Sequence, residues 1–168
     1  MNKRTKTKSK AISAAGPQKK TTRPGVVNVY VHPAAGKSGT AMAGSLTPSK
    51  IIESIQSGLP IRELEDLQSI LDVEIGKLAS LLGISKATLH RRKARGRLDP
   101  AESDRVLRFA RLMGKAVTVL GGIERARHWL TSPQYGLGGA VPLEYAETEP
   151  GAREVENLLG RIEFGVYS

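Results

Sequence analysis

The stretch LASLLGISKATLHRRKARGRL, residues 78–98, decides the fold of this chain. If a first helix begins at Ile75, the small residue Ala79 falls where two helices would cross, and Gly83 falls four residues later at a turn. Glycine suits that turn because a residue that leaves a helix often has a positive φ. Ser85 is then a good N-cap for a second helix. The spacing predicts a helix-turn-helix.

The second helix of this motif would carry its charge outward. Leu78, Leu82, Ile84 and Leu89 are the predicted inner side chains. Residues 86–97 hold six Lys and Arg and no acid, so the outer face would meet phosphates and base edges in a major groove. An ordinary solvated basic helix is the alternative, but the combination of charge and spacing favours DNA binding. The predicted DNA-binding residues are Ser85, Lys86, Ala87, Thr88, His90, Arg91, Lys93 and Arg95.

Arg92 does not fit this pattern. It lies three residues after Leu89, on a side where many helix-turn-helix proteins carry an apolar residue. Either its aliphatic stem packs inward while its charged head reaches solvent, or the second helix is rotated from the register assumed here.

Composition limits the class of protein. A chain of 168 residues with 39% hydrophobic and 4% aromatic residues suits one modest domain, or a small domain with an extension. The absence of cysteine excludes disulfides and thiolate metal sites. Glu124 and His128 lie four apart without a second histidine, which favours a surface pair over a metal site. We therefore expect no metal and no other cofactor.

The sequence also argues against a membrane partner. No apolar run approaches the roughly 20 residues that span a bilayer. The basic N-terminus lacks the apolar core of a secretory signal. A soluble cytoplasmic protein is expected.

Charge divides the chain into three regions. Residues 1–46 carry nine Lys and Arg and no acid, whereas the net charge is +2 over residues 47–99 and −1 over residues 100–168. The first region has little to bury, which predicts a disordered basic arm. The arm would either tether the protein to DNA phosphates or act as a solubilising tail, and its composition favours neither.

Within this arm, VVNVYVHPAAGKSGT, residues 26–40, is similar to a strand followed by a phosphate-binding loop. The loop motif requires glycine at position 31, where this chain has Val31. No apolar helical pattern follows Ser38 to supply a helix dipole. Nucleotide binding is therefore excluded, and the valine run is expected to form a strand only against a partner.

Residues 47–98 are predicted to form a helical DNA-binding domain that holds one reading helix rigid. Thr47 and Pro48 predict the start of a helix that ends before Gly58. Pro60 predicts the start of a second helix, which ends near Asp72. Two more helices are expected at 75–82 and 86–95. The residues expected to face water on the second of these helices are Arg62, Glu63, Glu65 and Asp66.

A long helix should follow this domain. Asp99, Pro100 and Glu102 match an N-cap, a first-turn proline and a capping-box acid, and the helix should run to about Leu120. Its apolar stripe is wider than one small domain needs, so it is either a homodimer seam or intrachain core. The stripe comprises Val106, Phe109, Ala110, Met113, Ala116, Val117 and Leu120.

The last third of the chain also reads as helices. Gly121 and Gly122 end the long helix, residues 123–130 form another, and Pro142 and Pro150 each begin one. Trp129 is either a core anchor or an interface residue. We find no catalytic constellation, so a binding protein rather than an enzyme is expected.

Three segments together resemble the Xre/MbcA/ParS-type antitoxins, which neutralise RES-domain toxins. They are TLHRRKARGRLDPAESDRVLRFARL (88–112), IERARHWLTSP (123–133) and LGGAVPLEYAETEPGAREVENLLGRIEFGVYS (137–168). The likeness covers about residues 47–168 and rests on the WL pair, the GG-x-x-PL segment, a Thr before a Gly, the Val of the final helix and the terminal Gly-Val. The basic arm lies outside it.

This resemblance implies an all-α fold and two functions. The helix-turn-helix domain, residues 47–98, would dimerise, bind operator DNA and repress its own operon. Residues 99–168 would form a helical domain for dimerisation and for binding a toxin that destroys NAD. The segment from Arg161 to Ser168 would approach the toxin's NAD pocket and occlude it.

The resemblance also implies which residues bind the toxin. They are Trp129, Pro142, Thr148, Gly151, Val155, Arg161, Glu163, Gly165, Val166, Tyr167 and Ser168. Trp129 and Val155 could instead simply hold the fold. The alternative function is a stand-alone helix-turn-helix regulator whose C-terminal domain dimerises or senses a small ligand.

Overall fold

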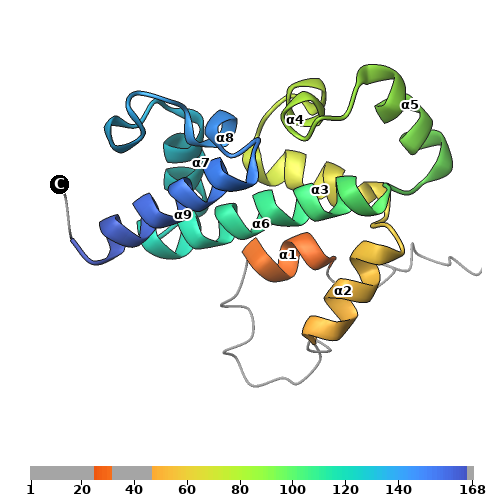
Figure 1. Ribbon diagram of the computed structural model, residues 1–168, viewed down its shortest axis with the longest axis horizontal. Coiled ribbons are helices and arrows are strands. Elements are labelled where there is room, and N and C mark those ends of the chain that lie inside the picture. Colours follow the sequence, from red (N-terminus) through yellow and green to blue (C-terminus); the bar gives the residue numbers. More distant parts are fainter. Residues whose placement is uncertain (1–24, 32–46, 166–168) are drawn as a thin grey trace, which may run out of the picture.

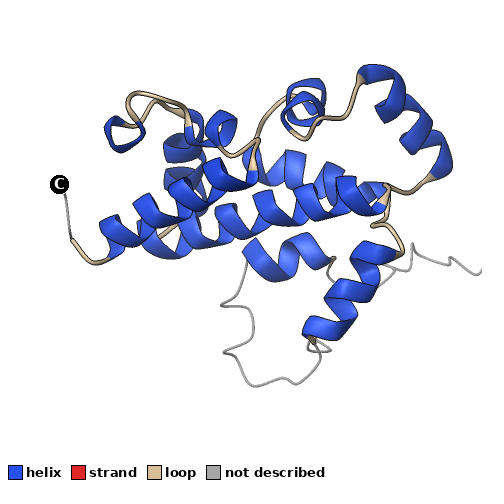
Figure 2. Cartoon of the chain, viewed as in Figure 1, coloured by secondary structure: helices blue, strands red, loops and turns tan. Residues whose placement is uncertain are grey.

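The structure, a computed structural model, describes residues 25–31 and 47–165 (Figure 1). These residues form helices joined by short connections and contain no strand, only an isolated bridge between Pro60 and Arg97 (Figure 2). The all-α prediction is confirmed. The elements are α1 (Val26–Val31), α2 (Pro48–Gln56), α3 (Ile61–Leu71), α4 (Ile75–Leu81), α5 (Lys86–Arg95), α6 (Pro100–Leu120), α7 (Ile123–Thr131), the 3-10 turn η2 (Tyr135–Leu137), α8 (Pro142–Tyr145) and α9 (Glu149–Glu163).

Among the described helices, none combines the length and the apolar character needed to cross a membrane.

Helix α6 is the central element of the fold. It packs against α1, α2 and α3 as well as α7 and α9, so both ends of the molecule are built on it (Figure 1). The predicted capping box is present: the Glu102 backbone N–H donates to Asp99 Oδ1 at 2.8 Å, and the Asp99 N–H donates to Glu102 Oε2 at 2.9 Å. At the other end, Gly121 adopts a φ of 74°, which closes the helix as expected.

The wide apolar stripe of α6 is intrachain core. Val106, Phe109, Ala110, Met113 and Ala116 are each at most 1% exposed. Helices on both sides of α6 cover them, among them α1, which the sequence analysis placed in a disordered arm. The stripe therefore no longer argues for a dimer seam.

The prediction for residues 26–31 was wrong, because this segment is neither disordered nor a strand. It forms α1, whose Val27 and Val31 are completely buried. A glycine makes this close approach possible: a Cβ at Gly114 of α6 would collide with the carbonyl oxygen of Tyr30. The rest of the predicted arm, residues 1–24 and 32–46, lies outside the described residues.

Glu63 of α3 holds the start of α1. Its side chain, expected to face water, is only 2% exposed, and Oε2 accepts a hydrogen bond of 3.0 Å from the Val27 backbone N–H. A carboxylate at this position satisfies an N–H that the helix itself leaves unpaired. Close by, Asn28 Nδ2 donates to Asp66 Oδ2 at 3.4 Å. The short α1 is therefore fixed by polar contacts as well as by its valines.

Arg127 of α7 connects the C-terminal helices to α3. Its guanidinium donates to the carbonyl oxygens of Ser69 and Ile70, which lie at the C-terminal end of α3. A cation is favourable there because unpaired carbonyls leave partial negative charge at the end of a helix. Arg127 Nη1 also pairs with Glu124 Oε1 at 2.7 Å, so the partner of Glu124 is Arg127 rather than the expected His128.

Candidate functional sites on the basic helix and the C-terminal helices

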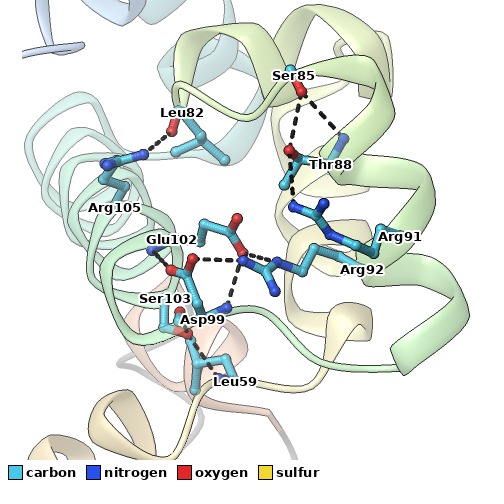
Figure 3. A network of polar contacts seen from close by, with 10 residues as sticks. All are labelled: Leu59, Leu82, Ser85, Thr88, Arg91, Arg92, Asp99, Glu102, Ser103 and Arg105. Atoms are coloured by element: carbon cyan, nitrogen blue, oxygen red, sulfur yellow. Dashed lines mark hydrogen bonds and ion pairs between the residues drawn. The ribbon is translucent and has the colours of Figure 1, made fainter.

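The helix-turn-helix has the predicted geometry. Gly83 has a φ of 65° at the turn after α4. Ile84, 3% exposed, fills the space beneath the turn, and its N–H donates to the Ala79 carbonyl at 2.8 Å. Ser85 caps α5, accepting at Oγ from the Thr88 N–H at 3.2 Å (Figure 3). The sequence signals at Gly83 and Ser85 are therefore confirmed.

Helix α5 presents most of the predicted DNA-binding residues to solvent. Its buried residue is Leu89, which points into the core as expected. Thr88 is half-buried, and its Oγ1 lies 3.0 Å from Ser85 Oγ. The exposed members of the predicted set are Ser85, Lys86, Ala87, His90, Arg91, Lys93 and Arg95. In the described part of the chain, none of the four basic residues Lys86, Arg91, Lys93 and Arg95 forms an ion pair with an acid.

Arg92 anchors α5 to the start of α6. Its Nε donates to Glu102 Oε2 at 2.7 Å and its Nη2 to Asp99 Oδ2 at 2.6 Å (Figure 3). The hydrogen bond to Glu102 is the main cause that raises the Arg92 pKa above its ordinary value, and the charge of Asp99 acts in the same direction. The guanidinium is thus paired rather than solvated, and the assumed register holds, so neither interpretation offered for Arg92 was correct.

A second arginine of the basic run is also structural. Arg97 Nη2 donates to the carbonyl oxygen of Gly58 at 2.6 Å and to that of Ser57 at 3.3 Å, which satisfies the end of α2. Together with Arg92, this removes two of the six basic residues of segment 86–97 from the candidate DNA surface. The remaining four were all named from the sequence.

The N-terminal half of α6 fixes the neighbouring elements by polar contacts that the sequence analysis missed. Ser103, completely buried, accepts from the Leu59 N–H at 2.8 Å and donates to the Asp99 carbonyl at 2.6 Å. Arg105 Nη1 donates to the Leu82 carbonyl at 2.7 Å, beside the turn of the motif (Figure 3). Arg92 therefore joins α5 to the capping box of α6, while Ser103 and Arg105 join the same end of α6 to Leu59 and to the turn after α4.

Several predicted toxin-binding residues lie inside the C-terminal helices rather than on their surface. Val155 is completely buried, and Pro142 and Gly151 are buried as well. A Cβ at Gly151 would collide with the Tyr145 carbonyl oxygen, so this glycine allows α8 and α9 to meet. Thr148 is exposed, but its Oγ1 caps α9 by accepting from the Gly151 N–H at 3.2 Å. These four residues shape the corner between α8 and α9.

The remaining predicted toxin-binding residues lie near the end of the chain or on α7. Trp129 is half-buried against the core. Arg161 is half-buried, whereas Glu163 and Gly165 are exposed at the end of α9. Val166, Tyr167 and Ser168 fall outside the described residues. Three exposed aromatic side chains were not predicted as site residues: Tyr135, Tyr145 and Phe164. Their signal in the sequence is the rarity of aromatic residues, which make up 4% of the chain.

A charged seam joins α6 to α9. Arg108 Nε lies 3.2 Å from Glu149 Oε2, and Arg111 Nη2 lies 3.2 Å from Glu156 Oε1. A hydrogen bond from Arg153, followed by the charge of Arg108, holds the pKa of Glu149 below its ordinary value. The seam borders a pocket of about 370 Å³, lined by Asp104, Leu107, Arg108, Arg111 and Glu149. Within the described residues there is no acid or histidine cluster suited to a metal ion.

Two family models match this chain in succession. Residues 50–111 match the antitoxin Xre-like helix-turn-helix domain, and residues 115–165 match the antitoxin Xre/MbcA/ParS C-terminal toxin-binding domain. The division between them falls within α6.

The relatives are antitoxins by name. The chain is 36% identical over 120 residues to Antitoxin Xre of Yersinia enterocolitica, covering 70% of this chain and 81% of that protein. It is 34% identical over 116 residues to Antitoxin Xre of Photorhabdus laumondii, covering 68% and 78%. It is 25% identical over 132 residues to a Prs ADP-ribosylating antitoxin of Sphingobium, covering 73% and 83%. With a helix-turn-helix domain and a C-terminal toxin-binding domain in this order, the chain belongs to the Xre family of antitoxins.

Proposed function

We propose that this antitoxin binds a RES-domain toxin that degrades NAD, occludes the toxin's NAD pocket with its C-terminal segment, and represses its own operon through α5. One observation carries the proposal. The basic helix α5 and the C-terminal end of α9 lie at opposite ends of the molecule, both held by α6 (Figure 1). Operator DNA and a toxin would therefore use separate surfaces of one chain.

The proposed DNA contact rests on α5. Lys86, Arg91, Lys93 and Arg95 are exposed, and Arg92 fixes the helix to α6 before any DNA is bound. A preformed reading helix loses little conformational entropy on binding. A homodimer would place two such helices on successive turns of a palindromic operator, about 34 Å apart. Ser85 and Thr88, at the N-terminus of α5, would lie near the DNA backbone.

The proposed toxin contact rests on the end of α9. A short segment that continues a rigid helix of 15 residues would lose little entropy when it enters a pocket. Glu163 is exposed there, and an acid would complement a pocket that must attract the phosphates of NAD. ADP-ribosyl transfer, named for the Sphingobium relative, also uses NAD as its donor. Occlusion of an NAD pocket would therefore neutralise either class of toxin.

The alternative, a stand-alone regulator that senses a small ligand, has less support. The pocket between α6 and α9 is the natural candidate for a sensor site. However, Arg108 and Arg111 in its lining are already paired with Glu149 and Glu156. These ion pairs are sufficient to explain the charged lining as a seam between two helices.

The test is to delete residues 161–168 and co-express the shortened chain with the toxin encoded by the adjacent gene. The deletion leaves the buried Leu158 and Leu159 of α9 in place. We expect the cells to lose their NAD and stop growing, while operator binding by the purified chain stays within about twofold of the full protein. Arg91→Ala is the matched variant, which should protect fully yet bind the operator poorly. Full protection by the shortened chain would refute occlusion.

A second measurement identifies the toxin's reaction. Loss of cellular NAD without labelled protein would indicate an NAD-degrading toxin. Transfer of ADP-ribose from labelled NAD to a protein would instead indicate an ADP-ribosylating toxin and would refute NAD degradation as the toxin's reaction. Absence of any toxin that this chain binds would refute the proposal as a whole.

A further inference from the structure

We propose that the loop of residues 133–140, which carries the exposed Tyr135, is a second toxin contact that supplies binding affinity, separate from the C-terminal segment that blocks the pocket. This inference rests on the proposed function, because it takes the toxin to be the partner of the C-terminal helices. It assigns affinity and inhibition to different parts of the chain.

Tyr135 is unusually exposed. Its relative exposure is 96%, compared with 43% for Tyr145 and 79% for Phe164. An aromatic side chain can bury 150–250 Å² of surface, about the largest gain available to a single residue. Tyrosine is also among the residues enriched at the energetic centres of protein interfaces. A fully exposed ring in a chain with few aromatics is therefore a strong candidate for an anchor.

The loop that carries Tyr135 is held at its base. Gln134 Nε2 donates to the carbonyl oxygens of Trp129 at 2.9 Å and Ser132 at 3.0 Å. The Gln134 backbone N–H donates to the Ala140 carbonyl, and the Gly139 N–H donates to the Gln134 carbonyl, both at 3.0 Å. These bonds close the loop and fix the residue just before the tyrosine.

The other side of the tyrosine is fixed by packing. A Cβ at Gly136 would lie only 2.6 Å from Leu158 Cδ1, so the backbone of the loop rests directly on α9. Leu137 then packs against the core. Tyr135 is thus presented outward between two fixed neighbours, and a rigid aromatic side chain loses little entropy when it is buried by a partner.

The position of the loop identifies the partner as the toxin. It lies within residues 115–165, the region matched to the toxin-binding domain. From Leu158, where the loop touches α9, six residues lead to Phe164, a rise of about 9 Å along the helix. The loop and the end of α9 project at the end of the molecule remote from α5 (Figure 1).

Charge argues against DNA as the partner of this loop. Between Arg127 and Arg153 the chain contains no Lys or Arg, but it contains Glu144, Glu147 and Glu149. A segment without Lys or Arg offers phosphates no cation to bind. Glu144 and Glu149 are already paired with Lys77 and Arg108. An uncharged, exposed aromatic side chain suits a protein surface with apolar groups.

The test compares three substitutions in the full chain for their affinity to the purified toxin of the adjacent gene, measured by calorimetry. Tyr135→Ala should weaken binding about 30-fold, the loss expected for an anchor residue. Tyr135→Phe keeps the ring and should stay within about threefold of the original. Ile52→Ala removes an exposed apolar side chain from α2, at the other end of the fold, and should change nothing. Operator binding should be the same for all three.

The deletion of residues 161–168, measured in parallel, separates this inference from the function on which it rests. We expect the shortened chain to bind the toxin, because the loop remains, but to leave the toxin active. Unchanged affinity of Tyr135→Ala would overturn the anchor, and the occlusion proposal would still stand if the deletion abolished inhibition. Equal losses for Tyr135→Phe and Tyr135→Ala would overturn burial of the ring as the cause. If the original chain does not bind the toxin, both proposals fail.

Discussion

Replacing Gly114 by alanine is expected to lower the free energy of unfolding when α1 is present and to raise it when α1 is absent. In the full chain, the new Cβ collides with the backbone oxygen of Tyr30, which cannot rotate away as a side chain could. Overpacking of this kind costs about 1–3 kcal/mol, because α1 must shift or separate from α6. In a chain that begins at Thr47, the three atoms nearest to this Cβ, all from Tyr30 and Val31, are gone. Alanine then stabilises a helix interior by about 1 kcal/mol relative to glycine.

These two effects give a measurable difference between the chains. Gly114→Ala should destabilise the full protein by up to about 2 kcal/mol and stabilise the shortened one by about 1 kcal/mol. Urea unfolding followed by circular dichroism, applied to four proteins as a double-mutant cycle, isolates the coupling of about 1–3 kcal/mol between Gly114 and α1.

Gly160→Ala on α9 is the matched control. The neighbour of its added Cβ is Lys115 Nζ at 3.8 Å, an ordinary contact, so alanine should stabilise both chains alike. If Gly114→Ala also stabilised both chains equally, α1 would not be docked on α6, and the explanation given for the buried stripe would be refuted.

Three further predictions concern arginines and an acid. Arg91→Ala should weaken operator binding by about 1–3 kcal/mol, the range for an arginine that reads a guanine, and should leave toxin affinity unchanged. Fluorescence anisotropy measures the operator affinity, and an equal loss of operator and toxin affinity would instead indicate a folding role. Arg92→Met should lower the thermal midpoint well below that of Arg91→Met, because it leaves the buried Glu102 carboxylate without its partner; equal midpoints would contradict this. The folded-state pKa of Glu149 lies below its ordinary value, so its ion pairs stabilise the fold above that ordinary value and lose this effect as the pH falls through the lowered pKa. Glu149→Gln should therefore reduce the acid-dependent loss of stability in unfolding scans, and an identical pH profile would show that the carboxylate contributes nothing.

Most helix boundaries could be predicted from the sequence because they depend on neighbouring residues. The caps at Thr47, Ser85 and Asp99 are each formed by a side chain and a backbone N–H three residues away. Such local chemistry is visible in any reading of the chain. The DNA-reading helix α5 could be predicted from the same kind of local spacing.

Contacts between distant segments could not be predicted in this way. A run of valines favours a strand, and α1 is a helix only because Gly114 and Glu63, far along the chain, provide a surface and a cap for it. Arg92 likewise finds its acids seven and ten residues away, across a turn. Neither arrangement leaves a periodic signal.

The family resemblance could not distinguish buried residues from exposed ones. Pro142, Gly151 and Val155 are buried, so they contribute to the packing of α8 and α9. Tyr135 was missed for the opposite reason: its exposure depends on how the bonds of Gln134 hold the loop, and the only signal in the sequence is the rarity of aromatic residues. A family resemblance identifies the domain more reliably than it identifies the contact surface.

The continuity of α6 has a consequence for how this protein can change. Because the DNA-reading and toxin-binding regions meet between residues 111 and 115 of one helix, no linker exists there to absorb an insertion. One added residue would rotate everything beyond it by about 100° and advance it by about 1.5 Å. Exchange of toxin-binding halves between related antitoxins would thus have to preserve the helical phase, so chimaeras joined in α6 should fold only when the junction keeps the residue count.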